Sequence, residues 1–322
     1  MSELAAPPQG TRLTAAAIQA ADAAARASGV QIRELAEVDD LQRLCAVVDE
    51  IWHPEPTNPP VTAELLRALA YAGNYVAGAF SGDRLVGACV GFFESPAAHA
   101  VHSHLAGVSP RVAGRHVGFA LKLHQRAWAL ARDVTSIAWT FDPLVCRNAY
   151  FNIVKLAAVP AEYLPDFYGA MDDVINAGDL SDRLLAVWPL AADPVVHASQ
   201  GAASAADAAG LRAAGAAVVL DIDGDGLPAI REAGPDATTV LVRVPLDIES
   251  VRRHHEAVAR RWRHAVRQVL GGLMSDGAKV AGFDRSGWYV VERSAADGDS
   301  SGLSRSVADG DSAGVSERKA AQ

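Results

Sequence analysis

Two patterns of residues in the middle of the chain could bind or transfer a chemical group. The first is Arg115-His116-Val117-Gly118-Phe119-Ala120, which fits Arg/Gln-x-x-Gly-x-Gly/Ala between an expected strand and an expected helix. Backbone N–H groups and the positive end of a helix bind anions at such a junction, and glycine lets the backbone approach closely. The pattern predicts a pyrophosphate site, with close helix–strand packing at Gly118 as the alternative.

The second pattern is the pair His102 and His104, which flank Ser103 on the strand before the glycine motif. Side chains two residues apart on a strand point to the same face, and imidazole titrates near neutral pH. Either histidine could act as a general base that takes a proton from an ammonium substrate, directly or through water. The alternative is that both histidines pack beside the sheet and are structural.

Hydrophobic spacing and turn residues predict the elements that position these patterns. A helix–strand–helix start is followed by a hairpin, and a strand–helix–strand crossover then carries both patterns. The expected elements are helices at 13–28, 38–51, 62–69, 118–132 and 149–156, and strands at 30–35, 74–80, 84–94, 102–108, 136–141 and 184–190. Together they predict an α/β or α+β protein, with a mixed, twisted sheet and helices on both faces.

The glycine pattern and the preceding Val108-Ser109-Pro110 resemble the coenzyme A-binding motif of the GNAT N-acyltransferase superfamily. The element order of residues 30–190 is similar to that fold, and residues 148–156 (NAYFNIVKL) are similar to its fourth helix. The resemblance implies an acyl-CoA co-substrate, with residues 115–120 at its pyrophosphate and Asn148 also at the cofactor. It further implies that the thioester lies where two parallel strands separate, with its carbonyl polarised by the backbone of Val108.

The chain departs from the family pattern at three positions. The family often has a tyrosine two residues before Lys155 that protonates the leaving thiolate, but Ile153 stands here and Tyr150 is the nearest alternative. His116 stands where glycine is common, and His102 stands where some members have a glutamate base, six residues before the valine of the motif. The general acid and base are therefore open on sequence grounds.

A late group of polar residues could hold an acidic acyl group or an amino-acid carboxylate, because arginine binds carboxylates at two points. Arg183 is the first candidate and Arg147 the second, while a salt-bridged loop is the alternative. The group comprises Asp166, Tyr168, Asn176, Asp179, Ser181, Asp182 and Arg183. Less specifically, the stretches WTFDPLVCRNAYFNIVKL, GDLSDRLL and GWYVV resemble GNAT-related proteins encoded near N-acylamino acid racemases.

Composition limits the class of protein. The 322 residues carry a formal net charge of -9, which argues against a nucleic-acid partner. Cys45, Cys89 and Cys146 lack CxxC spacing, so a reducing cytoplasm is expected rather than a disulfide framework or a zinc ribbon. No apolar run approaches the ~20 residues of a membrane span, and no signal peptide is evident. The oligomeric state stays open, with a homodimer as one option.

We expect four segments: an N-terminal extension with a helix (1–29), the acyltransferase domain (30–190), a C-terminal α+β unit (191–293) and a disordered tail (294–322). The C-terminal unit should contain a strand at 238–244, a helix at 248–273 and two further strands. The arginines of that helix are interpreted as its solvated face, with a coenzyme A 3′-phosphate or an acidic partner as the alternative. They are Arg252, Arg253, Arg260, Arg261, Arg263 and Arg267.

One motif resembles a metal-binding site by spacing alone. Residues 221–232 match the spacing of a calcium-binding EF-hand loop. A strand precedes this loop and Pro228 lies within it, so a turn between two strands is predicted and no metal cofactor is expected.

The sequence thus predicts an acyl-CoA-dependent N-acyltransferase. It would transfer an acetyl or succinyl group from acetyl-CoA or succinyl-CoA to a small-molecule amine such as an amino acid, by direct attack without a covalent enzyme intermediate. The alternatives are a non-catalytic acyl-CoA-binding regulatory or scaffold module, and a protein N-acetyltransferase.

Overall fold

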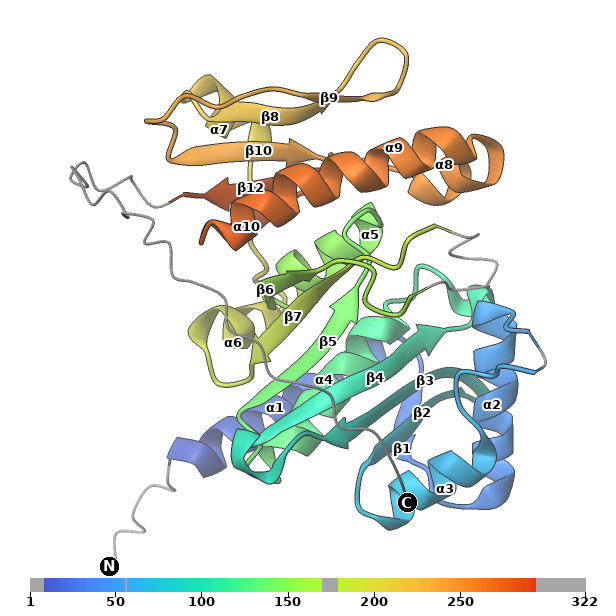
Figure 1. Cartoon of the computed structure of the whole chain (residues 1–322). Coiled ribbons are helices and arrows are strands. Elements are labelled where there is room, and N and C mark those ends of the chain that lie inside the picture. The colour runs from blue at the N-terminus through green and yellow to red at the C-terminus, as the bar shows by residue number, and fades with distance from the viewer. Residues whose placement is uncertain (1–8, 56, 170–178, 294–322) are drawn as a thin grey trace, which may run out of the picture.

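The computed structural model describes residues 9–55, 57–169 and 179–293. Two mixed β-sheets, one of seven strands and one of five, organise these residues, and Figure 1 shows them one above the other. Helices cover both faces of the larger sheet, so the predicted α/β class is confirmed. Asn176 of the polar group and the expected tail lie outside the described residues.

The first sheet has the order β1-β2-β3-β4-β5-β7-β6. Its strands are β1 (Gln31–Glu34), β2 (Tyr75–Ser81), β3 (Arg84–Phe93), β4 (Ala100–Val108), β5 (Ser136–Phe141), β6 (Val159–Leu164) and β7 (Arg183–Pro189). β4 and β5 are parallel, whereas the other neighbours in this sheet are antiparallel. Parallel neighbours need a crossover, and α4 (Val117–Leu130) supplies it.

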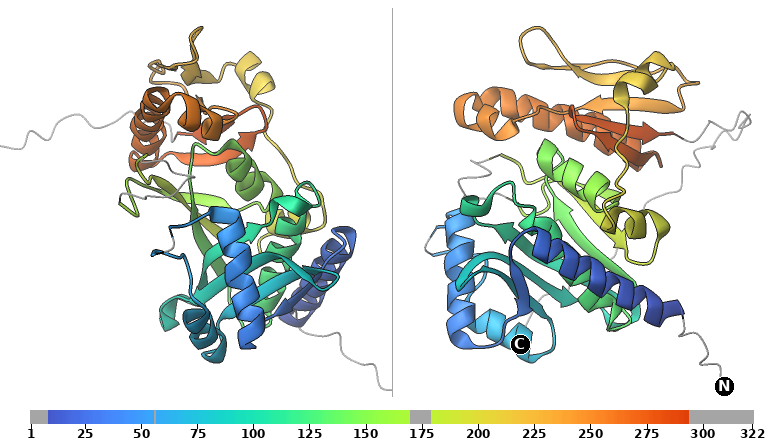
Figure 2. Two further views of the ribbon diagram at one scale, coloured as in Figure 1. Left: turned by 90° about the vertical axis from the view of Figure 1, so that its right-hand side faces the viewer. Right: turned by 180° about the vertical axis from the view of Figure 1, so that it is seen from behind.

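Two groups of helices pack against opposite faces of this sheet. α2 (Val38–Trp52) and α3 (Ala63–Tyr71) cover one face, and the Thr62 side chain caps α3 by accepting a bond from the Leu65 N–H at 3.2 Å. The opposite face carries α4, α1 (Gln9–Ala27), and α5 (Cys146–Ala149) with its π-helical continuation η3 (Tyr150–Lys155). α1 packs along α4 (Figure 2). Short connections contain η1 (Pro96–Ala98), η2 (Pro110–Val112) and α6 (Asp193–Ser199).

The second sheet has the order β11-β12-β10-β8-β9. Its strands are β8 (Ala217–Ile222), β9 (Pro228–Ile230), β10 (Thr239–Arg243), β11 (Lys279–Asp284) and β12 (Trp288–Glu292). Its helices are α7 (Ala208–Ala213), α8 (Ile248–His254), α9 (Glu256–Val266), the π-helical η4 (Arg267–Gly271) and α10 (Gly272–Ser275). β8 and β9 are antiparallel neighbours, which confirms that the EF-hand-like segment is a turn between strands.

The arrangement of three strands of the first sheet, β5, β6 and β7, recurs in the second sheet. β5 leads into a helix with π-helical turns, then β6 and β7, and β7 lies between β5 and β6. β10 leads likewise into helices with π-helical turns, then β11 and β12, and β12 lies between β10 and β11. The packing is reciprocal as well, because η3 contacts β11 while η4 and α10 contact β6.

Two expectations about secondary structure were wrong. β6 was not anticipated; it contains Pro160 and is the edge strand of its sheet, where proline is tolerated. The single helix expected at 248–273 is interrupted at His255, whose φ of -144° is not helical. Within the described residues no helix has the length and apolar character needed to cross a membrane.

Candidate active site

β4 and β5 separate after only three paired positions. The ladder runs from Ala100↔Ser136 to His102↔Ala138, yet β4 continues to Val108 and β5 to Phe141. Among the described residues, the 103–108 stretch of β4 therefore has no ladder partner on its β5 side. Backbone N–H and C=O groups along such an edge can form hydrogen bonds with a ligand. This is the strand separation that the GNAT resemblance implies beside Val108.

A β-bulge lies on β4 where the strands begin to part. Against β3, Leu105 pairs with Val90 and Ser103 pairs with Gly91, so His104 lies at the irregularity between them. Bulges bend a strand and redirect side chains, and they are common beside active sites. The bulge thus lies directly after the last β4–β5 pair, and the His104 ring lies near Phe92 of β3.

The N-terminus of α4 offers unpaired donors next to this opening. The N–H groups of Phe119 and Ala120 both bond to the His116 carbonyl, at 3.0 and 3.2 Å. Those of His116, Val117 and Gly118 have no acceptor in the described part of the chain. They can therefore bind an anionic group at the positive end of the helix.

Packing does not explain the glycine at position 118. A Cβ placed there would meet only Val108 Cγ2 at 3.6 Å, which is ordinary van der Waals contact. The alternative that Gly118 serves tight helix–strand packing is therefore not supported. His116 precedes the helix with a left-handed φ of 61°, a conformation that is unfavourable for a non-glycine residue and is often found at functional sites.

The side chain of Arg115 has a different partner. Its Nη2 donates to the carbonyls of Ser28 and Gly29, at 2.9 and 3.0 Å, and its own N–H bonds to the Val112 carbonyl at 3.3 Å. Arg115 therefore ties the turn between α1 and β1 to the loop before α4.

The two histidines share one face of the sheet, as expected. Their rings lie near Phe92, with centroid separations of 5.2 Å for His102 and 6.0 Å for His104. His104 is exposed and His102 is partly buried. Burial, followed by the charges of His104 and Lys122, lowers the pKa of His102. A lowered pKa keeps this imidazole neutral at neutral pH, the form that accepts a proton.

Arg183 lies on the same face as the histidines. His102 pairs with Ala138, and Thr140 of the same strand pairs with Leu185 of β7, so alternation places Arg183 on this side as well. Tyr168 joins the group, because its hydroxyl is 3.0 Å from Thr140 Oγ1 and its ring lies 5.2 Å from the Arg183 guanidinium carbon.

Three other predicted residues lie elsewhere. Tyr150 packs against the core on the opposite face of the sheet, and the Arg285 guanidinium is 5.6 Å from its ring. Asn148 is partly buried at the start of the helix, with its N–H bonded to the Val145 carbonyl. Arg147 pairs with Glu249 of α8 and borders a cavity of about 350 Å³ between the two sheets' connecting helices.

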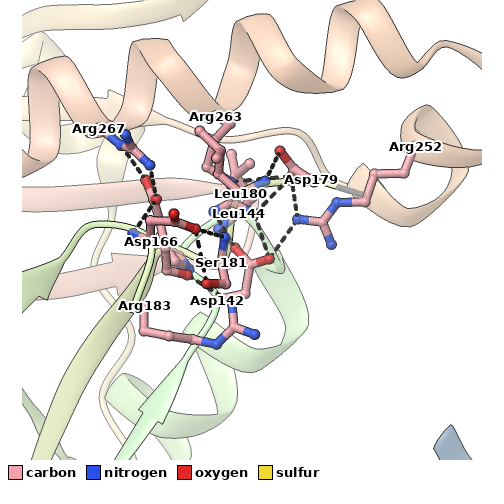
Figure 3. A network of polar contacts seen from close by, with 12 residues as sticks. Asp142, Leu144, Asp166, Asp179, Leu180, Ser181, Arg183, Arg252, Arg263 and Arg267 are labelled. Carbon is pink, nitrogen blue, oxygen red and sulfur yellow. Dashed lines mark hydrogen bonds and ion pairs between the residues drawn. The ribbon is translucent and has the colours of Figure 1, made fainter. Parts of the chain in front are cut away.

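A buried ion network follows directly after β5, and Figure 3 shows it. Asp142 receives two bonds from Arg263, at 2.8 Å each, and Arg263 also donates to Asp179 at 2.9 and 3.2 Å. Burial would raise the pKa of Asp142, but Arg263 and Arg252 hold it well below its usual range. The Asp142 carboxylate therefore stays ionised.

The interpretation of the arginines as a solvated helix face was wrong for Arg252 and Arg263, which are 5% and 0% exposed. Acidic residues distant in sequence pair with them, so burial of the charges is tolerated. Arg252 lies on α8 and Arg263 on α9, on either side of the break at His255, so spacing along one helix gave no signal for their shared partners.

Asp182 forms a second part of this network. It accepts bonds from the Tyr163 hydroxyl at 2.7 Å, the Asp166 N–H at 3.0 Å and Arg267 Nε at 2.9 Å. Desolvation opposes ionisation of Asp182, but Arg267 and Tyr163 together lower its pKa. For Asp182, which pairs with Arg267, the structure shows the salt-bridged arrangement that was the alternative to a binding site, while Asp166 accepts hydrogen bonds from Ser181.

Two charged residues near the opening were missed from the sequence. Glu50 of α2 accepts a bond from Ser109 Oγ at 2.6 Å and pairs with Arg111 at 3.1 Å, beside Val108. Lys122 of α4 is buried, and it donates to Ser103 Oγ at 3.1 Å and Gln125 Oε1 at 2.8 Å. Burial lowers the pKa of Lys122 to about 8. In the described ranges, no three His, Cys, Asp or Glu side chains gather as a metal site.

Comparison with known proteins finds no matching family model and no matching curated protein. Solved acetyltransferase structures match about half of this chain. An acetyltransferase of the GNAT family from Desulfovibrio desulfuricans is 16% identical, covers 50% of this chain and 99% of its own, and has a TM-score of 0.41. An N-acetyltransferase from Staphylococcus aureus Mu50 is 14% identical, with coverages of 50% and 98% and a TM-score of 0.42.

The yncA acetyltransferase from Salmonella typhimurium, solved with its cofactor acetyl-CoA, is 13% identical to this chain. It covers 50% of this chain and 94% of its own, with a TM-score of 0.42.

Proposed function

We propose that this protein is a GNAT-type N-acyltransferase that moves a short acyl group from coenzyme A to a small-molecule amine. One observation carries the proposal. Among the residues that the structure describes, the edge of β4 has no strand partner beyond His102, and the N–H groups of residues 116–118 at the start of α4 have no acceptor. An acyl-CoA fits both features. Its thioester arm needs hydrogen-bond partners along an extended backbone, and its pyrophosphate needs anion-binding N–H donors.

The reaction proceeds by direct transfer. His102, neutral because burial lowers its pKa, accepts a proton from the ammonium of the acceptor, directly or through water. The amine nitrogen then bonds to the thioester carbon, the C–S bond breaks, and the coenzyme A thiolate takes up a proton. Backbone N–H groups near Val108 stabilise the oxyanion that forms on the carbonyl.

The donor is acetyl-CoA or succinyl-CoA, and Arg183 is the residue that would favour the acidic one. It lies on the histidine face beside Tyr168. Arg147 is the weaker candidate, because its side chain is 69% exposed.

A second function, acyl-CoA binding without catalysis, is favoured by one observation. Tyr150, the nearest substitute for the family's thiolate-protonating tyrosine, packs against the opposite face of the sheet from His102 and contacts Arg285. No general acid is therefore identified from its position.

Thiol release with an amine panel separates the two functions. The protein is incubated with acetyl-CoA or succinyl-CoA and each amine, and free coenzyme A is measured over time. Amine-dependent release supports the transferase. A rise in melting temperature with acyl-CoA but no release with any amine supports the binding module, and absence of both contradicts the coenzyme A assignment.

A further inference from the structure

Arg252 is a buried arginine whose hydrogen-bonding capacity is only partly used. Its side chain is 3% exposed, and Nη2 donates to Asp142 at 2.5 Å and to Asp179 at 3.1 Å. Its Nε and Nη1 are buried and have no hydrogen-bond partner among the described residues. Buried donors without acceptors are costly, so this guanidinium suits a ligand that supplies oxygen atoms.

Arg263 binds the same two aspartates, and all three of its guanidinium nitrogens donate hydrogen bonds. Its side chain is 1% exposed. Both acids are thus already fixed without Arg252. In Figure 3 both dashed lines from Arg252 start at one nitrogen of its guanidinium.

The network lies on the face proposed for the acceptor. Ala138, which pairs with His102, alternates with Thr140 and then with Asp142, so their side chains share the histidine face. Asp142 directly follows β5, the strand that borders the opening, and Arg252 donates to it.

The charges nearby limit what the ligand can be. Asp142 and Asp179 share the bound nitrogen of Arg252, and a doubly charged phosphate would be repelled by them. A carboxylate carries a single charge and offers two oxygen acceptors, which arginine binds well. Burial together with the nearby Arg263 and Arg252 also lowers the pKa of Arg183, which indicates that these cations are close to one another.

We propose that Nη1 of Arg252, which has two N–H donors on the outer edge of the guanidinium, binds the carboxylate of the acceptor, so that the preferred substrates are free amino acids. This inference rests on the proposed acyl transfer. It also gives the C-terminal unit a role, because α8 supplies a residue to a site built mainly on the first sheet.

The test compares amino acids with their α-amides, which keep the amine and lose the negative charge. We expect kcat/KM to be about 10- to 100-fold higher for the acid, the range for a charge-assisted hydrogen bond. Arg252→Met should lower kcat/KM for the acid by that factor and bring the acid-to-amide ratio close to one. Arg260→Met removes a surface charge from the neighbouring helix and should leave the ratio as in the wild type.

Arg252→Lys covers the case in which Arg252→Met fails to fold, because it keeps the charge and loses the planar donors. It should show an intermediate ratio. Equal kcat/KM for acids and amides in the wild-type protein would overturn the proposal and leave acyl transfer intact. So would an equal loss for acid and amide in the variants.

A binding measurement keeps the proposal testable if no amine is acylated. Free amino acids and N-acetyl amino acids should raise the melting temperature more than the corresponding amides, and Arg252→Lys should reduce that difference. Equal shifts for acid and amide would count against the carboxylate site. Failure of acyl transfer with every amine, combined with a carboxylate-specific shift, would reject the proposed function but not this site.

Discussion

Arg263 on α9 and Asp142 at the end of β5 form a two-point ion pair, with both Nη–Oδ distances at 2.8 Å. The pair joins a helix of the second sheet to the strand that borders the proposed thioester site. Its burial makes it costly to break from one side, because the remaining charge has no water to solvate it.

Arg263→Met should therefore destabilise the protein by about 3–5 kcal/mol, the usual cost of breaking a buried pair. Urea unfolding followed by tryptophan fluorescence measures this. Arg260→Met is the matched control, because Arg260 pairs with Glu256 on the surface, and it should cost less than about 1 kcal/mol. Similar losses of unfolding free energy in the two variants would show that the buried Arg263 pair stabilises the protein no more than a surface pair.

Gly118→Asp should separate folding from cofactor binding. The position has room for a Cβ, and an acidic residue in the first turn of a helix is stabilising, so the free protein should not lose stability. A saturating acyl-CoA adds about 2.7 kcal/mol at 100 times its Kd, and the aspartate should abolish that gain by repelling the pyrophosphate.

Gly118→Ala is the control for size without charge, and it should keep most of the rise in melting temperature. If the folded aspartate variant still responds to acyl-CoA as the wild type does, this loop does not hold the pyrophosphate.

The pH dependence of kcat/KM should identify the base. The pKa of His102 is lowered from its ordinary value near 6.5, and a base works in its deprotonated form. Activity should thus rise with pH along a limb centred below 6.5 and be flat above about pH 7.

His102→Gln should remove that limb and reduce kcat/KM by about 10²–10⁴-fold, while His104→Gln keeps the limb. If the limb is lost in His104→Gln instead, the bulged histidine is the base.

Lys122 should make stability depend on pH in the alkaline range. Its pKa is lowered from 10.5 to about 8 in the folded protein, so between these values the unfolded chain binds more protons than the native one. Stability rises with pH where this holds. Well below pH 8 Lys122 is protonated in both the native and the unfolded state, so it adds no pH dependence to the free energy of unfolding.

Between pH 7 and 9.5 the wild type should gain about 2 kcal/mol relative to Lys122→Met, at 1.36 kcal/mol per pKa unit over roughly 1.5 units. Urea titrations of both proteins at the two pH values give this difference directly. Parallel pH profiles would mean that Lys122 titrates normally.

Local patterns predicted much of the first sheet. The strand at 136–141 was placed at its observed limits, and the helix after Gly118 differs from α4 by only one or two residues at either end. Such elements follow from periodicity and turn residues, which act over a few positions. The shared face of His102 and His104 followed from alternation in the same way.

What the sequence did not predict depends on partners far along the chain. Arg252 and Arg263 looked like surface residues, because Asp142 and Asp179 lie more than 70 positions away. β6 was missed because an edge position, which makes Pro160 tolerable, is a property of the assembled sheet. Tyr150 was chosen by its distance in sequence from Lys155, which does not reveal that its side chain packs on the face opposite His102.

The reciprocal packing of the two sheets bears on cooperativity. Because η3 contacts β11 while η4 and α10 contact β6, each sheet covers part of the other's edge. A chain ending at Leu190 would expose β6 and leave Asp142 and Asp182 without Arg263 and Arg267. We therefore expect the two sheets to unfold together in one transition, and a chain cut between them to lose the fold of both parts.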